Sequence, residues 1–174
     1  IMVHADKVGT GPSLFPNMEA AIQWKTKIEP AFEAMRVRIP QRVMADPEAL
    51  REAAAEVLPT VLAGLSRPLA KVGAHFFAYK YEFSMDQEPN DAALLRALLE
   101  DAQRTLQQEF TKEPSLSGIH ILLATLLQPV APVSDAHLPL GPATRNAWAR
   151  PDLAAEFPEL IAWRDKMYEI HRSI

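Results

Sequence analysis

The sequence predicts an all-α helical bundle. Apolar side chains recur every three or four residues through most of the chain, which is the period of one face of an α-helix. Only 6 of the 174 residues are glycine, and no useful run of alternating β-branched residues occurs, so the turns and strands of a β-rich fold are not indicated. Apolar residues make up 48% of the chain, which is enough to fill a packed core.

Two helices are predicted in the first part of the chain. The first begins after Asn17, whose side chain suits an N-cap, and runs to about Val37. The second begins at Asp46, a capping carboxylate that proline follows at the first helical position, and its apolar stripe continues from Leu50 to Leu65. The apolar face of the first helix is expected to comprise Ala21, Trp24, Ile28, Ala31, Phe32 and Met35.

Residues 75–81, His-Phe-Phe-Ala-Tyr-Lys-Tyr, form the richest aromatic segment. Two interpretations stay open for this segment. It either ends a helix that packs on the core or forms one wall of an apolar ligand pocket.

Three more helices are predicted after residue 89. Asn90 or Asp91 opens a long helix with the buried stripe Leu95, Leu99, Ala102, Leu106 and Phe110. Ser115 is the predicted cap of the next helix, Leu116 to about Gln128, which is apolar nearly all round and should therefore be the most buried. The proline-rich residues 129–150 predict an irregular crossing. A last helix begins at Pro158 and presents Leu160, Trp163, Met167 and Ile170 on one face.

Charge and composition argue against several functions. The 18 basic and 22 acidic residues give a net charge of −4, which disfavours nucleic acid or an anionic membrane surface as a partner. The chain has no cysteine, which excludes disulfides, cysteine-bound metal and a cysteine nucleophile, and fits a cytoplasmic or other reducing compartment. No apolar run reaches the roughly 18 residues of a membrane span. The five histidines lack the spacing that places two metal ligands on one helix face, so no metal is expected.

Four segments together resemble one family. Residues 114–121, Pro-Ser-Leu-Ser-Gly-Ile-His-Ile, resemble the P-S-L-A-D-I-H-L motif that opens the buried sixth helix of glutathione transferases, and residues 94–110 match the preceding helix. Residues 157–165, Phe-Pro-Glu-Leu-Ile-Ala-Trp-Arg-Asp, resemble the family's closing helix. Residues 1–16 are similar to the end of the third helix and the interdomain linker. The chain is therefore expected to be a fragment, with 1–16 as the tail of a missing thioredoxin-like domain and 17–174 as the helical domain.

The resemblance implies a divided site. Glutathione would be the cosubstrate, bound mainly by the absent domain, so no catalytic or glutathione-binding residue is assigned to this chain. The helical domain would supply the pocket for a small apolar electrophile and the contacts of a homodimer or larger assembly. By resemblance the pocket wall is the first helix near Trp24, Ile28 and Met35, and Phe77 and Tyr79 of the aromatic segment are further candidates.

Two departures from the family leave the function open. Gly118 stands where the family usually has Asp, and restoring the carboxylate by Gly118→Asp is expected to stabilise the helix start. Residues 38–90 are longer than the family's usual connection. An alternative is therefore a non-catalytic transferase-like module that serves as a structural subunit or a protein-interaction scaffold, and a further one is an unrelated helical bundle that binds ligands. The sequence does not decide whether the protein is an enzyme.

Overall fold

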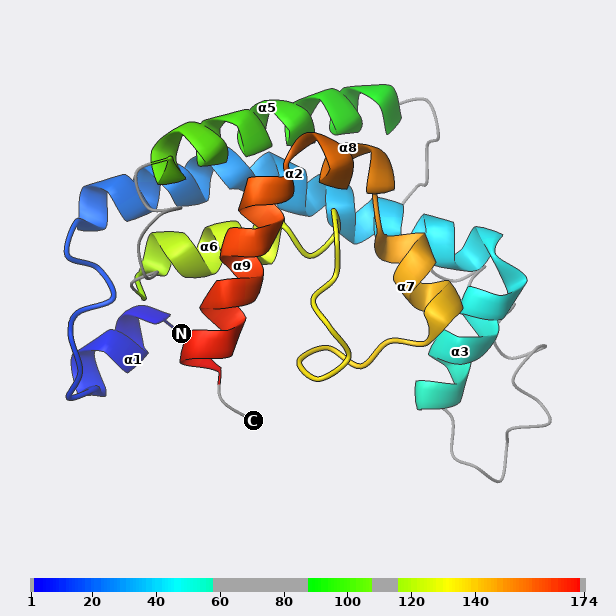
Figure 1. The fold of residues 1–174 in the computed structure, drawn as a ribbon, viewed down its shortest axis with the longest axis horizontal. Helices are drawn as coiled ribbons and strands as arrows, with labels where there is room; N and C mark the ends of the chain where they lie inside the picture. The colour runs from blue at the N-terminus through cyan, green and yellow to red at the C-terminus, as the bar shows by residue number, and fades with distance from the viewer. Residues whose placement is uncertain (1, 58–87, 108–115, 173–174) are drawn as a thin grey trace.

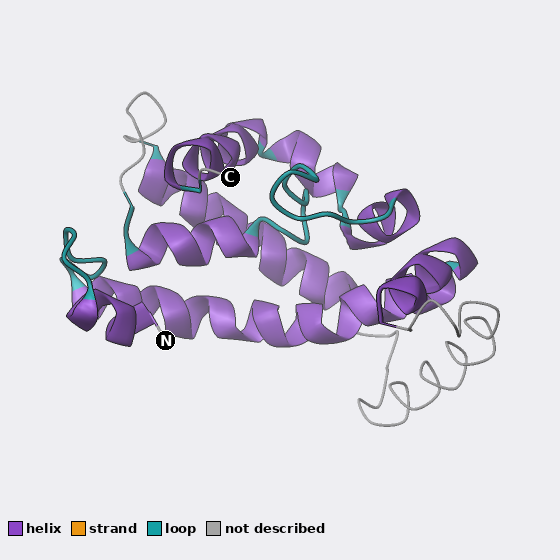
Figure 2. Cartoon of the chain, turned by 90° about the horizontal axis from the view of Figure 1, so that it is seen from below, coloured by secondary structure: helices purple, strands orange, loops and turns teal. Residues whose placement is uncertain are grey.

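The computed structural model describes residues 2–57, 88–107 and 116–172, and these residues form helices joined by loops (Figure 2). The all-α bundle is confirmed for these ranges. Phe77, Tyr79, Phe110 and Ser115 lie outside the described residues. The helices are α1 (Met2–Val8), α2 (Met18–Ala45), α3 (Pro47–Val57), α5 (Glu88–Leu106), α6 (Gly118–Leu126), α7 (Pro142–Trp148), α8 (Pro151–Glu156) and α9 (Pro158–His171).

The long helix α2 runs along most of the molecule, with α5 and α6 packed against it (Figure 1). Its N-cap is Asn17, as predicted, and the Asn17 side chain accepts the Ala20 N–H at 3.0 Å. The helix passes through two prolines and ends at Ala45, well beyond the expected end at Val37. Asp46 then begins α3, because its carboxylate accepts the Glu48 and Ala49 amides at 2.9 and 3.3 Å.

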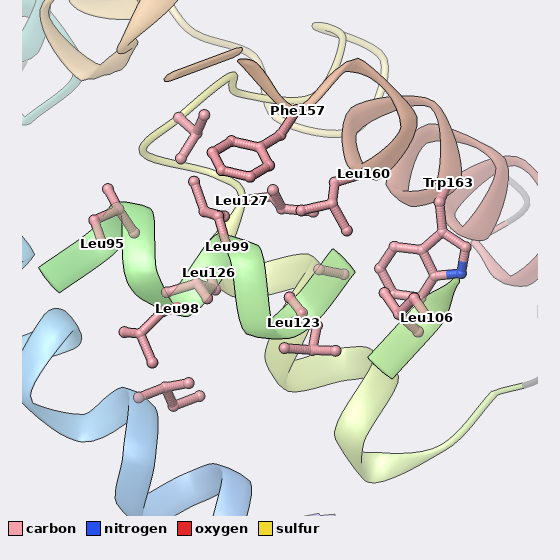
Figure 3. Close-up of a cluster of buried hydrophobic side chains, with 14 of the residues drawn as sticks. Leu95, Leu98, Leu99, Leu106, Leu123, Leu126, Leu127, Phe157, Leu160 and Trp163 are labelled. Atoms are coloured by element: carbon pink, nitrogen blue, oxygen red, sulfur yellow. The ribbon is translucent and has the colours of Figure 1, made fainter. Parts of the chain in front are cut away.

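The core lies where α2, α5, α6 and α9 meet (Figure 3). The predicted stripe of α5 is confirmed for its described members, all of which are buried. Burying a leucine side chain contributes roughly 1.5–3 kcal/mol relative to exposure, so this cluster is the main source of stability. Its largest fully buried apolar residues are Ile28, Leu99, Leu106, Leu123, Leu126, Leu127, Val130, Leu153 and Leu160.

Helix α6 begins later than the sequence predicts. Its N-cap is Ser117 rather than Ser115, and the Ser117 hydroxyl accepts the His120 N–H at 3.3 Å. Leu116 precedes the helix and is 42% exposed. Leu123 and Leu126 are buried, whereas Ile119, Ile121 and Leu122 are only half-buried. The helix is therefore packed against α2 and the core on one side and is not enclosed all round, contrary to the expectation from its composition.

Gly118 lies in close contact with Leu14 and Phe15 of the segment after α1. Its N–H donates to the Leu14 carbonyl at 2.6 Å, so the segment after α1 rests on the start of α6. A Cβ atom at residue 118 would overlap the Phe15 ring and lie 2.8 Å from its Cδ1 and 2.9 Å from its Cζ. The family's Asp has no room here unless Phe15 moves. This finding removes the basis for expecting Gly118→Asp to stabilise the protein.

The Trp-Arg-Asp segment of α9 joins that helix to the end of α6. Trp163 packs in the core, and Arg164 is only 2% exposed. The Arg164 guanidinium donates to the carbonyls of Leu127 and Ala131, which follow α6, and to the Asp165 carboxylate at 2.9 Å. It therefore joins α9 to the turn after α6, where the Leu127 carbonyl also accepts the Val130 and Ala131 amides at 3.1 and 3.0 Å. The segment that most resembles the family's last helix has a structural role here.

Candidate functional site

The best candidate site is an apolar groove between α2, the end of α6 and α7. We call it the α2–α7 groove. Its volume is about 460 Å³, within the range of small-molecule sites. It is lined by Phe32, Met35, Arg36, Ile39, Pro40, Thr125, Gln128, Pro129 and Trp148.

Helical spacing places one wall of the groove on α2. Phe32, Met35 and Ile39 follow one another at intervals of three and four residues, so their side chains share a face. All three are half-buried, which leaves part of their apolar surface open to a ligand. The turn after α6 adds Pro129 to the lining, and the last residue of α7 adds Trp148.

The polar side chains around the groove already have partners within the chain. Thr125 donates to the Ile121 carbonyl at 2.7 Å, and Arg36 pairs with Glu33 at 2.6 Å. Gln128 accepts the Val133 N–H at 3.1 Å and donates to the Tyr168 hydroxyl at 2.9 Å. The rest of the lining is mostly apolar, so the groove offers a ligand mainly apolar contact.

A carboxylate holds the N-terminal end of α7. Glu52 of α3 accepts the Thr144 N–H at 2.8 Å, the Thr144 hydroxyl at 2.9 Å and the Ala143 N–H at 3.3 Å. These hydrogen bonds, above all that from the Thr144 backbone, hold the pKa of Glu52 below its usual value. The helix N-cap is Gly141, which has no side chain to serve these amides, so Glu52 replaces the missing cap.

A guanidinium holds the other end of α7. Arg42 of α2 places Nη1 3.3–3.4 Å from the carbonyl oxygens of Ala147, Trp148 and Ala149. A positive charge is favourable at this end, because the helix dipole is negative there. Just beyond α7, the Arg150 N–H donates to the Val130 carbonyl at 2.8 Å. Trp148 is therefore carried by a short helix that is fixed at both ends.

The groove adjoins one further depression, which in turn adjoins another beside α1. Thr125 also lines a depression of about 210 Å³ between α6 and α9, where Tyr168 and Arg172 contribute. Leu116 and His171 line that depression and a third one, of about 510 Å³, which includes Asp6 of α1. Asp6 and His171 are thus the ionisable side chains of the third depression.

The structure separates the residues that the sequence proposes for the pocket. Met35 lines the α2–α7 groove, but Ile28 is fully buried in the core cluster. Trp24 is half-buried and packs against that cluster, with Lys27 Nζ 5.2 Å from its ring centroid. Phe77 and Tyr79 lie outside the residues that the structure describes.

Sequence reasoning missed Trp148. The one signal available was a tryptophan within a segment otherwise rich in small and polar residues.

Comparison of the chain with protein-family models, curated proteins and solved structures finds no match. In the described ranges, no helix is long and apolar enough to cross a membrane. Those same ranges contain no group of three or more acidic or histidine side chains placed to hold a metal ion.

Proposed function

We propose that the chain is the helical domain of a glutathione transferase-like protein, and that its α2–α7 groove binds a small apolar electrophile. The observation that carries the proposal is the groove itself, which is concave, mostly apolar and of small-molecule size. Met35 of α2, a residue that the family resemblance marks as pocket wall, is one of its lining residues. Glutathione would supply the thiolate that attacks the electrophile, and the groove would bind and orient the electrophile.

We assign no glutathione site to the described residues. Asp6, the acidic group of α1, already accepts the Leu14 N–H and the Ser13 hydroxyl. In the α2–α7 groove the one cationic side chain, Arg36, is paired with Glu33. By the resemblance, glutathione would be bound mainly by the absent thioredoxin-like domain.

A second candidate is a non-catalytic module that joins other subunits. The observation that favours it is a set of exposed apolar side chains on α1, the start of α2 and the segment before α6. They are Val3, Val8, Met18, Ile22 and Leu116. Exposed apolar side chains mark a protein–protein contact where they lie together in one patch. A homodimer or larger assembly through such a patch would need no chemistry from the groove.

Titration with a neutral fluorescent ligand, N-phenyl-1-naphthylamine, separates the two candidates. We expect saturable binding that Trp148→Ala weakens about tenfold, because loss of one aromatic wall removes roughly 1.4 kcal/mol of contact. The matched control is Ile22→Ala, which removes an exposed side chain of α2 outside the groove and should leave the affinity unchanged.

Three other results would contradict the proposal. Binding that Trp148→Ala leaves unchanged would place the ligand elsewhere. Absence of binding, together with self-association that Ile22→Ala reduces in sedimentation, would favour the assembly module. A calorimetric titration of the chain with glutathione should show no submillimolar binding, and such binding would overturn the divided site.

A further inference from the structure

We propose that Glu52 and Arg42 are positioning residues that set the width of the α2–α7 groove, and hence the size of the ligand that it selects. The inference rests on the proposed binding function of the groove. Of the described residues that line the groove, Trp148 alone comes from α7. The distance between this ring and the wall formed by Phe32, Met35 and Ile39 therefore depends on where α7 lies.

Hydrogen bonds at its two ends fix the position of α7. The helix has only seven residues, too few to be stable in isolation, so contacts with its neighbours must hold it. At the start, three donors of Ala143 and Thr144 converge on the Glu52 carboxylate. At the end, Arg42 faces three carbonyls, including that of Trp148 itself. We call these two sets of contacts the clamp of α7. Its two residues come from outside α7: Arg42 from α2 and Glu52 from the adjoining α3.

Gly141 gives independent evidence that the Glu52 clamp has a specific geometry. A Cβ atom at residue 141 would overlap the Glu52 carboxylate and lie 2.9 Å from its Cγ. The absence of a side chain therefore allows the carboxylate to approach the helix end. An alanine at residue 141 should displace Glu52 and release α7 without removing the negative charge. Gly141→Ala and Glu52→Gln, which change different chemical groups, are therefore both predicted to release α7.

The clamp is tested by measuring the ring position and ligand selectivity together. The full chain is labelled with 5-fluorotryptophan, and the Trp148 ¹⁹F resonance is assigned from the Trp148→Phe variant. Dissociation constants are measured for a small neutral ligand, indole, and a larger one, N-phenyl-1-naphthylamine. In Glu52→Gln and in Gly141→Ala the Trp148 resonance should shift or broaden. In both variants the ratio of the two affinities should change at least fivefold in favour of the larger ligand.

Matched controls exclude a general loss of stability. Glu48→Gln neutralises an exposed carboxylate of the same helix, and Gly11→Ala adds a methyl group where the structure leaves open space. Both should keep the Trp148 resonance and should change the affinity ratio less than twofold. Glu52→Asp keeps the charge but shortens the reach, and should fall between wild type and Glu52→Gln. It also carries the test if Glu52→Gln does not fold.

The outcomes separate this inference from the function on which it rests. If the wild-type chain binds neither ligand, the proposed function fails, and the inference fails with it. If the wild type binds both but Glu52→Gln and Gly141→Ala keep the wild-type affinity ratio, the clamp does not set selectivity and only this inference is overturned. A Trp148 resonance that moves without a change in the ratio leads to the same rejection.

Discussion

The contact between Gly118 and Phe15 predicts that Gly118→Ala destabilises the protein, whereas helix propensity alone predicts that it stabilises the protein. In an unobstructed helix, Gly→Ala gains up to about 1 kcal/mol. Here the added methyl group must displace the Phe15 ring, which is half-buried against the start of α6. Full burial of such a ring stabilises a protein by about 1.5–3 kcal/mol. The hydrogen bond from the Gly118 N–H to the Leu14 carbonyl contributes about 1 kcal/mol more, and it also requires Leu14 and Phe15 to lie close to Gly118. We expect Gly118→Ala to destabilise the protein by about 1–2 kcal/mol.

A double-mutant cycle isolates this contact. Urea denaturation of the wild type, Gly118→Ala, Phe15→Ala and the double variant gives four free energies of unfolding. Once the ring at residue 15 is removed, the methyl group has space, so Gly118→Ala should become neutral or stabilise by up to about 1 kcal/mol. The coupling energy between the two positions should therefore be about 1–2 kcal/mol. Gly118→Asp should also destabilise the wild type, because the 0.3–1 kcal/mol typical of a carboxylate near a helix start does not offset the overlap.

Two results would refute this reasoning. Stabilisation by Gly118→Ala in the wild-type background would mean that the ring does not restrict the site. Equal effects of Gly118→Ala with and without Phe15 would mean that the two residues are independent. Either result would restore the expectation from the sequence, in which Gly118 is merely a weak point in the first turn.

Two further predictions concern caps. Ser117→Ala should lower the free energy of unfolding by about 1 kcal/mol in urea, and a larger loss from Ser115→Ala would show that the cap is misassigned. Because folding lowers the pKa of Glu52, its contribution to stability should be complete above about pH 4.5 and be lost as the pH falls through the lower folded value. The difference in urea midpoint between the wild type and Glu52→Gln should be constant from pH 6 to 8 and shrink below about pH 4.5. With Glu48→Gln as control, a pH-independent difference would contradict the Glu52 cap.

The parts of the fold that short-range patterns determine could be predicted from the sequence. Asn17 and Asp46 cap helices through amides two or three residues ahead, so a short stretch of sequence contains the whole interaction. The choice between Ser115 and Ser117 is different, since both precede the same apolar run. It depends on where the Leu14 carbonyl meets Gly118, a contact between residues more than a hundred positions apart.

The candidate groove illustrates a second limit of prediction from the sequence. Ile28 and Met35 lie on the apolar face predicted for α2, yet one is fully buried and the other lines an opening. Helical periodicity identifies the face but not which part of it neighbouring helices cover. That division depends on how α5, α6 and α7 pack along α2. Trp148, which also lines the groove, belongs to a segment in which the abundance of proline obscured the short helix α7.

The residues that fix α7 show why the support of a site is harder to predict than its lining. An apolar lining residue such as Met35 leaves a periodic signal, because it shares a face with other apolar residues. Glu52 and Arg42 act instead on backbone amides and carbonyls, which every segment of chain possesses, so their partners have no sequence signature. Gly141 is informative only once a carboxylate is known to rest against it. In this protein the α2 side chains that would touch a ligand follow from helical periodicity, whereas Trp148 and the residues that hold α7 are found only in the tertiary structure.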